Sequence, residues 1–252
     1  MKTDKYQRRF YRDWVKAKDL YSARIVVKET DLQILTDKPA NAEFVKTRIQ
    51  KYRGDIENYI SKDRRFLTAL KPIEVELKAP LIVKEMSRQA KKANVGPIAA
   101  VAGAIAEFLG RDLLRKGYKE VIIENGGDIF LKSHKPRTIG LYAGKLKLWN
   151  KLGLKIKPQD TPLGICTSSG TIGHSLSFGS AESVVILSRN ASLADAVATA
   201  CANRVKSKQD LQKVVDFAKS TKGISGAVII LKDSLISWGS LEFTKAFCSM
   251  QI

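Results

Sequence analysis

The sequence predicts one α+β domain over residues 1–252, in which antiparallel sheets pack against helices. Helical patterns alternate with pairs of short apolar runs that have the pattern of hairpins, whereas a doubly wound sheet would place single strands between helices. No low-complexity linker divides the chain. Apolar residues make up 44% of the sequence and charged residues 27%, as in ordinary globular proteins that bury a substantial core.

The first part of the chain predicts a hairpin followed by helices. Apolar runs on either side of a polar turn predict two strands within 23–36. Asn41 can cap a helix whose apolar positions recur at helical spacing as far as Ile60. Beyond it we expect an irregular connection at 63–72 and a short helix at 81–93.

Residues 97–116 predict an alanine-rich helix. Pro97 suits the first helical turn, where its missing N–H costs nothing, and Gly117 is a natural stop. The small residues from Ala99 to Ala104 allow a neighbour or a ligand to approach closely. Tight packing is the simpler explanation of these small residues, and a surface that faces a cofactor is the alternative.

The second part of the chain predicts further hairpins around two helices. The expected elements are strands on either side of a Gly-Gly break within 120–131, a strand at 138–144, a lysine-rich loop or irregular hairpin at 145–160, helices at 193–205 and 210–218, and a hairpin of 226–231 and 234–239. The two apolar helices, at 97–116 and 193–205, each adjoin a strand-rich block. This arrangement hints at an internal duplication, although the two halves are too dissimilar in sequence to count as a repeat.

The charge balance is unusual, because 44 basic and 25 acidic residues give a formal net charge of +19. The basic residues are spread along the chain and no nucleic-acid-binding motif is present, so nucleic-acid binding is not expected despite this charge. No apolar run approaches the ~20 residues that span a bilayer, and the charged N-terminus lacks the apolar segment of a secretory signal. Three scattered cysteines do not form a disulfide framework. We expect a cytoplasmic protein without a membrane segment.

The stretch 161–205 holds the strongest candidate site. Its Ser/Thr/Gly-rich turn at 167–170 suits an anion that is bound by backbone N–H groups. Asp195 and Thr199, four residues apart, share one face of the following helix and offer oxygen ligands for a cation. From residue types alone, this metal–phosphate interpretation is as good as that of a capped structural helix. The Asn-Gly-Gly-Asp sequence at 125–128 is by itself typical of a hairpin turn.

Other kinds of site have weaker support. His134 and His174 have no partners at the spacing of a His/Cys metal site. Ser168, Ser169 and His174 could belong to a serine hydrolase, but the G-x-S-x-G elbow is absent. Cys166 is a candidate nucleophile, although a lone cysteine beside an apolar residue is more often a small core residue. The Walker A and G-x-G-x-x-G phosphate-binding patterns are both absent.

Several motifs taken together resemble a known superfamily. They are VGPIAAVAGAIAE (95–107), ENGGDI (124–129), GICTSSGTIGHSLSFG (164–179) and ADAVAT (194–199), with KETDLQI (28–34) and RGDIENYI (53–60). Each motif is short, but the ordered set covers nearly the whole chain. The set resembles the ApbE superfamily, and in particular its short prokaryotic branch rather than the flavin transferases proper.

The resemblance implies an ApbE-like α+β fold, related to a duplicated T-fold, with a ligand cleft between sheet and helices. In the flavin transferases of the superfamily this cleft holds FAD and a divalent cation, usually Mg²⁺. Matched motif by motif, the implied metal ligands are the carbonyl of Ala99 and the side chains of Asp195 and Thr199. His174 matches a histidine of the transferases and is the candidate catalytic residue. The implied contacts of the flavin diphosphate and nucleotide are Asn125, Gly126, Gly127, Asp128, Thr167, Ser168, Ser169 and Gly170.

The chain departs from the transferases in two places. Ala100 stands where they carry a lysine, and HSLSFGSAE takes the place of their H-x-x-D-P-x-T-G segment. Both changes remove groups that could contact the cofactor or take part in catalysis. We therefore expect ligand binding to be retained, whereas FMN transfer has weaker support.

The predicted function is that of an ApbE-like protein that binds flavin, or another nucleotide or small phosphorylated ligand, with Mg²⁺. One alternative is an accessory protein of sulfide assimilation and homocysteine synthesis, to which the resemblance connects members of this branch in methane-producing archaea. The other alternative is an FAD:protein FMN transferase. A second copy in a homo-oligomer and a sulfur-assimilation protein are the candidate protein partners.

Overall fold

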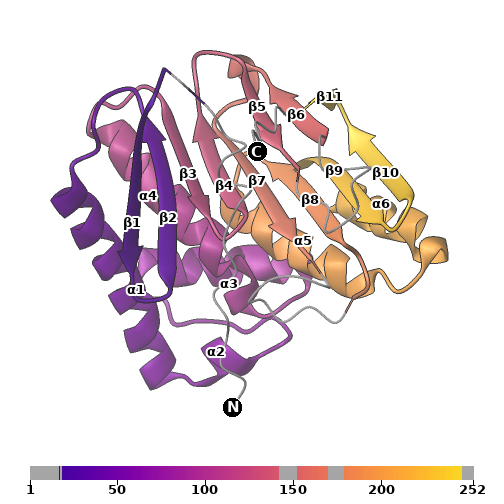
Figure 1. Ribbon diagram of the computed structural model, residues 1–252. Helices are drawn as coiled ribbons and strands as arrows, with labels where there is room; N and C mark the ends of the chain where they lie inside the picture. The colour runs from indigo at the N-terminus through magenta and orange to yellow at the C-terminus, as the bar shows by residue number, and fades with distance from the viewer. Residues whose placement is uncertain (1–16, 18, 142–151, 170–178, 246–252) are drawn as a thin grey trace.

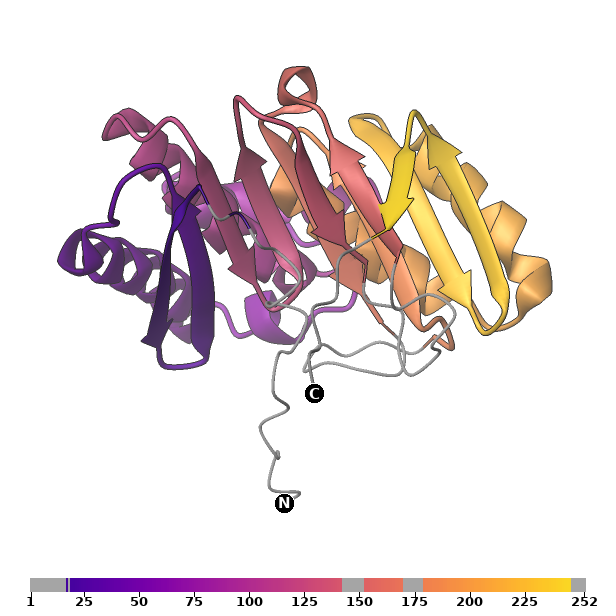
Figure 2. The same ribbon diagram turned by 45° about the horizontal axis from the view of Figure 1, so that its top comes forward.

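Eight antiparallel strands form one sheet, which carries helices on one face and a small three-stranded sheet on the other (Figures 1 and 2). The computed structural model describes residues 17, 19–141, 152–169 and 179–245. The strand order in the large sheet is β1-β2-β3-β4-β7-β8-β9-β10, and in the small sheet β11-β6-β5. The architecture is therefore α+β with antiparallel sheets, which confirms the predicted fold class.

The first half of the chain builds one hairpin, a helical layer and a second hairpin. In chain order its elements are β1 (Tyr21–Val27), β2 (Thr30–Thr36), α1 (Ala42–Lys62), α2 (Arg65–Thr68), α3 (Leu81–Ala93), the 3₁₀ helix η2 (Pro97–Ala100), α4 (Val101–Arg115), β3 (Val121–Asn125) and β4 (Asp128–Lys132). The side chain of Asn41 accepts the Phe44 N–H at 2.9 Å and caps α1, as the sequence predicts.

The second half repeats this order. Its elements are β7 (Leu163–Ser168), β8 (Ser183–Ser188), α5 (Ala191–Arg204), the 3₁₀ helix η4 (Lys208–Asp210), α6 (Leu211–Ser220), β9 (Ile224–Leu231) and β10 (Ser234–Gly239). Both halves run hairpin–helices–hairpin, and the sheet joins them through the pairing of β4 with β7. The duplication suggested by the sequence is thus present in the topology.

The small sheet comes from segments between and after the two halves. These segments are β5 (Arg137–Gly140), β6 (Leu152–Ile156) with the 3₁₀ helix η3 (Pro158–Asp160), and β11 (Glu242–Lys245). Each of the two faces of the large sheet has its own core, because successive strand residues point to opposite faces. Ile123 and Phe130 face the helices, whereas Ile122 and Leu131 pack towards the small sheet.

Three local expectations from the sequence were wrong. The helix expected over 97–116 begins with the 3₁₀ turn η2 and becomes an α-helix only at Val101. The connection at 63–72 contains the short helix α2. The segment expected to be a lysine-rich loop or an irregular hairpin, 145–160, contains β6, which pairs antiparallel with β5. The expected strand at 138–144 is shorter, since β5 ends at Gly140; its positions 142–144 lie outside the described residues.

Among the described residues, no single helix is long and apolar enough to cross a membrane. By length and composition, only α3 and the η2–α4 segment qualify together, and a bend of 103° separates them.

Two motifs noted in the sequence meet at the tip of the first hairpin. Arg53 of α1 donates to the Thr30 hydroxyl at 2.7 Å and to Glu57 at 2.8 Å, and it also contacts Glu29. Lys28, which has a positive φ of 53° in the turn, donates to Glu57 at 2.7 Å. The KETDLQI and RGDIENYI motifs therefore hold the β1–β2 hairpin on α1.

A buried ion pair ties the small sheet to the end of the large one. Arg137 at the start of β5 donates to Glu120 at 2.8 Å and to Asp19 at 2.7 Å. Glu120 also accepts the Ser133 hydroxyl at 2.5 Å and the His134 N–H at 2.6 Å. Burial alone would raise the pKa of Glu120, but the hydrogen bonds from Ser133, Arg137 and His134 lower it below the ordinary value.

We expect Glu120→Gln to lower the free energy of unfolding by about 3 kcal/mol at pH 7, because the change leaves Arg137 buried without its full partner. A lowered pKa stabilises the fold above pH 4.5, the ordinary value, and this contribution is lost as the pH falls through the folded-state pKa. The difference between parent and variant should therefore shrink on acidification. Urea titrations of both proteins at several pH values measure this difference in unfolding free energy. An equal difference at pH 7 and pH 3 would contradict a stabilising role of the ionised Glu120.

Candidate functional site

The N-terminus of α5 lies in close contact with both α4 and β7. A Cβ atom on Gly103 of α4 would lie 2.4 Å from the carbonyl oxygen of Ala191 and 2.8 Å from Cβ of Asp195. A Cβ on Gly164 of β7 would lie 2.4 Å from Cα of Ala191. Only glycine fits at these two positions, and the close approach brings Asp195 to the first turn of α4.

Glu107 fixes this contact between α4 and α5. Its carboxylate is buried and accepts the Ala191 N–H at 2.6 Å and the Ser192 N–H at 3.4 Å. Arg111, one turn further along α4, donates to the same carboxylate at 2.6 Å. A carboxylate at a helix N-terminus satisfies free N–H groups and is favoured by the helix dipole. Glu107 therefore holds the helix that carries Asp195.

Asp195 reaches across to the first turn of α4. Its Oδ2 accepts the Gly103 N–H at 2.9 Å, in a buried position. In a continuous α-helix this N–H would bond to the carbonyl of Ala99, four residues earlier. Because the chain is a 3₁₀ turn at Pro97–Ala100, the Gly103 N–H is instead available to Asp195.

The β3–β4 turn contacts the same peptide group from the other side. Asn125 Nδ2 donates to the carbonyl of Ala102 at 3.1 Å, and this carbonyl belongs to the same peptide unit as the Gly103 N–H. Gly126 and Gly127 have φ angles of 68° and 103°, which glycine adopts readily. Among the described residues, no atom lies within 4 Å of the position that a Cβ on Gly126 would take, so this turn leaves room beside its backbone.

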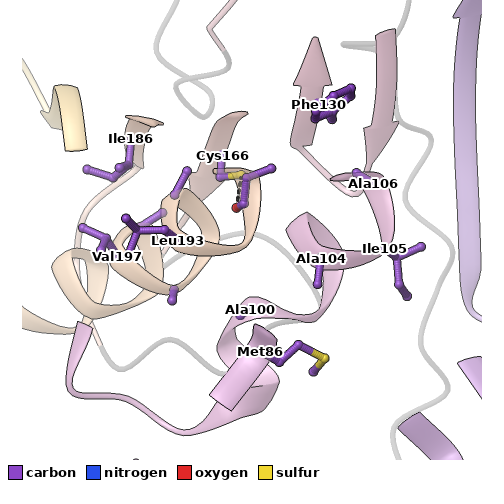
Figure 3. Close-up of a cluster of buried hydrophobic side chains, with 14 of the residues drawn as sticks. Met86, Ala100, Ala104, Ile105, Ala106, Phe130, Cys166, Ile186, Leu193 and Val197 are labelled. Carbon is purple, nitrogen blue, oxygen red and sulfur yellow. Dashed lines mark hydrogen bonds between the residues drawn. The ribbon is translucent and has the colours of Figure 1, made fainter. Parts of the chain in front are cut away.

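Asp128 and Cys166 lie at the buried side of this region. Burial, and then the charge of Asp195, raise the pKa of Asp128 well above its ordinary value. Asp128 accepts the Thr167 N–H at 3.2 Å. The Cys166 thiol is fully buried and donates to the Ala191 carbonyl at 3.3 Å (Figure 3). Burial and the two neighbouring carboxylates raise the pKa of this thiol, so it is a poor nucleophile.

Ser168 ends β7 on the face that is turned towards the helices. Cys166, two residues earlier, packs in the helix-side core, and residues two apart in a strand point to the same face. Ser168 is 7% exposed, and its hydroxyl has no hydrogen-bond partner among the described residues. A buried hydroxyl without a partner is costly, so Ser168 is suited to contact a bound molecule.

The donors around Asp195 fit a divalent cation with oxygen ligands. Burial raises the pKa of Asp195 to about 7, and a bound cation would offset that cost. Thr199 lies one helical turn further on, half-buried, and its hydroxyl has no hydrogen-bond partner in the described part of the chain. The 3₁₀ turn that contains Ala99 packs against α5. Carboxylate, hydroxyl and carbonyl oxygens are ligands that Mg²⁺ accepts together with water and phosphate.

No group of three or more His, Cys, Asp or Glu side chains in the described ranges could hold a metal ion. His174 and Gly170 lie outside the described residues.

The structure brings Asn125 and Asp195, from distant motifs, together at the first turn of α4. Asn125, Asp128, Ser168 and Asp195 all lie on the helix-facing side of the sheet or next to it. The sequence singled out these residues, but it did not indicate Glu107. In the sequence, Glu107 is distinguished only as a carboxylate within an alanine-rich apolar helix. The N–H group that its carboxylate accepts belongs to Ala191, 84 residues further along the chain.

The comparisons with known proteins agree with this fold. The family model described as "AbpE bacteria" matches residues 12–235. A UPF0280 protein of Methanocella arvoryzae is 39% identical over 220 residues, which is 87% of this chain and 89% of that protein. A UPF0280 protein of Methanococcus vannielii is 40% identical over 219 residues, covering 85% and 89%.

Solved structures of ApbE proteins have a similar fold at low sequence identity. The flavin transferase ApbE from Vibrio cholerae superimposes with a TM-score of 0.60 at 14% identity, over 88% of this chain and 98% of that one. The ApbE protein of Thermotoga maritima gives a TM-score of 0.58 at 14% identity, over 86% and 96%. At this identity the likeness concerns the fold.

Proposed function

Because the chain belongs to the "AbpE bacteria" family, an ApbE-like family with UPF0280 relatives, we propose that it binds a flavin, or another nucleotide or phosphorylated ligand, with Mg²⁺. One observation carries the proposal. Asn125 and Asp195, from opposite halves of the chain, bond to the two ends of one peptide unit, Ala102–Gly103. The Ala102 carbonyl orients the side-chain amide of Asn125 beside the Gly126–Gly127 turn. The Gly103 N–H orients the carboxylate of Asp195, which faces the cation.

Each group then has a part in binding. Asp195, Thr199 and the carbonyl of Ala99 hold Mg²⁺, which supplies positive charge to a diphosphate. The hydroxyl of Ser168 donates to a phosphate oxygen. The Gly126–Gly127 turn lets a nucleotide approach the backbone closely, since no Cβ projects into the space there.

FMN transfer is less well supported than binding. Ala100 stands where the transferases carry a lysine, and its methyl side chain is fully buried. This position therefore supplies no positive charge to a bound ligand. An accessory role in sulfur assimilation would make use of the basic surface and of a reactive thiol such as Cys166, and the Cys166 thiol is buried. Retained binding without transfer is the function that these residues support best.

Isothermal titration of the full chain with FAD, FMN and ADP tests the proposal, with and without Mg²⁺. We expect at least one of them to bind, and to bind more tightly with Mg²⁺, because the cation neutralises both the diphosphate and Asp195. Inorganic sulfate is the control for general attraction of anions to a chain of net charge +19. The proposal fails if none of the three nucleotides binds under either condition.

A further inference from the structure

Exposed leucines gather on the segment that joins α2 to α3. Seven large apolar residues of the described chain are well exposed, and four of them lie between positions 67 and 81. Their exposed fractions are 42% for Leu67, 66% for Leu70, 95% for Leu77 and 72% for Leu81. Single exposed apolar residues are ordinary on a protein surface, but four exposed leucines within residues 67–81 make this segment a candidate binding surface.

Residues 67–81, the leucine strap, run along α3. Its start lies against Gly96, where a Cβ would be 1.7 Å from the Ala69 carbonyl. Further along, the Ser87 hydroxyl donates to the Ile73 carbonyl at 2.6 Å, and Lys84 donates to the Leu77 carbonyl at 3.2 Å. The leucine strap is therefore antiparallel to α3 and fixed to it.

The inner and outer sides of the leucine strap differ in composition. Ile73 and Val75 are partly buried against the helix-side core, which accounts for the inward side. Leu70, Leu77 and Leu81 are mostly exposed; Leu70 lies towards the C-terminal end of α3, near Gly96, and Leu81 is in the first turn of α3. In Figure 1, α2 is at the bottom of the molecule, on the side away from the three-stranded sheet.

The leucines are surrounded by positive charge. Residues 62–92 contain nine Lys and Arg residues against four Asp and Glu residues. Three of those acids are already neutralised by ion pairs: Asp63 with Arg65 at 2.8 Å, Glu74 with Lys91 at 2.5 Å and Glu85 with Arg88 at 2.5 Å. Six cations have no ion-pair partner among the described residues: Lys62, Arg64, Lys71, Lys78, Lys84 and Lys92.

We propose that the leucine strap is a docking surface for a membrane leaflet rich in anionic lipid. Leucines would enter the boundary between headgroups and acyl chains, while the unpaired cations would contact lipid phosphates. A second copy of the chain fits this surface less well, because two such surfaces would bring their unpaired cations together. The charge of the leucine strap is thus complementary to anionic headgroups and not to itself.

Co-sedimentation of the full chain with phosphatidylcholine vesicles, with and without phosphatidylglycerol, tests this docking. We expect binding only to the vesicles that contain phosphatidylglycerol. The triple variant Leu70→Ser, Leu77→Ser, Leu81→Ser should reduce the bound fraction about ten-fold, because it removes the apolar contribution and keeps the charge. These side chains are exposed, so thermal unfolding should match that of the parent chain.

The control variant is Tyr21→Ser with Val26→Ser on β1, which removes two apolar side chains that are 56% and 50% exposed at the edge of the sheet. It should bind vesicles as the parent does. The proposal is overturned if the parent chain does not bind vesicles that contain phosphatidylglycerol. It is also overturned if the triple variant binds them as well as the parent does, because binding would then depend on charge alone. A self-association that depends on the leucines, without vesicle binding, would assign the surface to a second copy instead.

Discussion

The Gly103→Ala variant is expected to lose about 3 kcal/mol of unfolding free energy, although alanine normally stabilises a helix interior by up to about 1 kcal/mol. The new methyl group would lie 2.4 Å from the Ala191 carbonyl oxygen, and backbone atoms cannot move aside as a flexible side chain can. To relieve the clash, α4 and α5 must separate. Separation also stretches the hydrogen bonds from Gly103 to Asp195 and from Ala191 to Glu107.

Gly54 in α1 supplies a matched control for this variant. A Cβ there would meet nothing within 4 Å, so Gly54→Ala should stabilise the chain by about 0.5–1 kcal/mol. Urea unfolding followed by circular dichroism measures both changes. If Gly103→Ala is as stable as the parent, then the contact between α4 and α5 is looser than the structure indicates.

The second large effect concerns Asp195→Asn, which should abolish the dependence of ligand affinity on Mg²⁺. The amide can still accept the Gly103 N–H through its oxygen, so the fold is expected to persist, while the charge that attracts the cation is gone. We expect affinity for the nucleotide that binds the parent to fall by on the order of 100-fold with Mg²⁺ present, which is about 2.7 kcal/mol. Without Mg²⁺ the two proteins should bind almost equally.

Asp216→Asn is the control for that experiment, since Asp216 is exposed on α6 and, among the described residues, accepts a hydrogen bond only from Gln212. Its titration with nucleotide and Mg²⁺ should match that of the parent chain. An Asp195→Asn protein that keeps a full response to Mg²⁺ would place the cation elsewhere, and would leave Asp195 with a structural role at the start of α4.

Much of the fold could be predicted because its local signals are strong. The β1–β2 hairpin has apolar runs around a polar turn, and α1 has both a capping Asn41 and a regular apolar stripe. β6 could be expected only as part of a loop or an irregular hairpin, because its sequence LGLKI includes a glycine and a lysine in a lysine-rich region. The four-residue helix α2 is too short to show a helical period.

The candidate site could be predicted only as separate motifs. The sequence indicated Asn125–Asp128 and Asp195 through their residue types and their resemblance to a family. These residues come together because Gly103, having no side chain, lets α4 pack closely against Ala191 of α5. Ala191 is 88 positions further along the chain, so the sequence does not show this contact. Glu107 shows the same limitation, because a carboxylate that caps a distant helix has no periodic or spacing signal.

The peptide unit between Ala102 and Gly103 has a consequence for how the chain assembles. A fragment that ends after β4 would contain this peptide unit and Asn125 but lack Asp195, and the complementary fragment would carry Asp195 without its donor. Neither fragment alone completes the arrangement. The ligand-binding arrangement would thus be complete only after β4 has paired with β7 and joined the two halves. A bound ligand would then stabilise the association of the two halves.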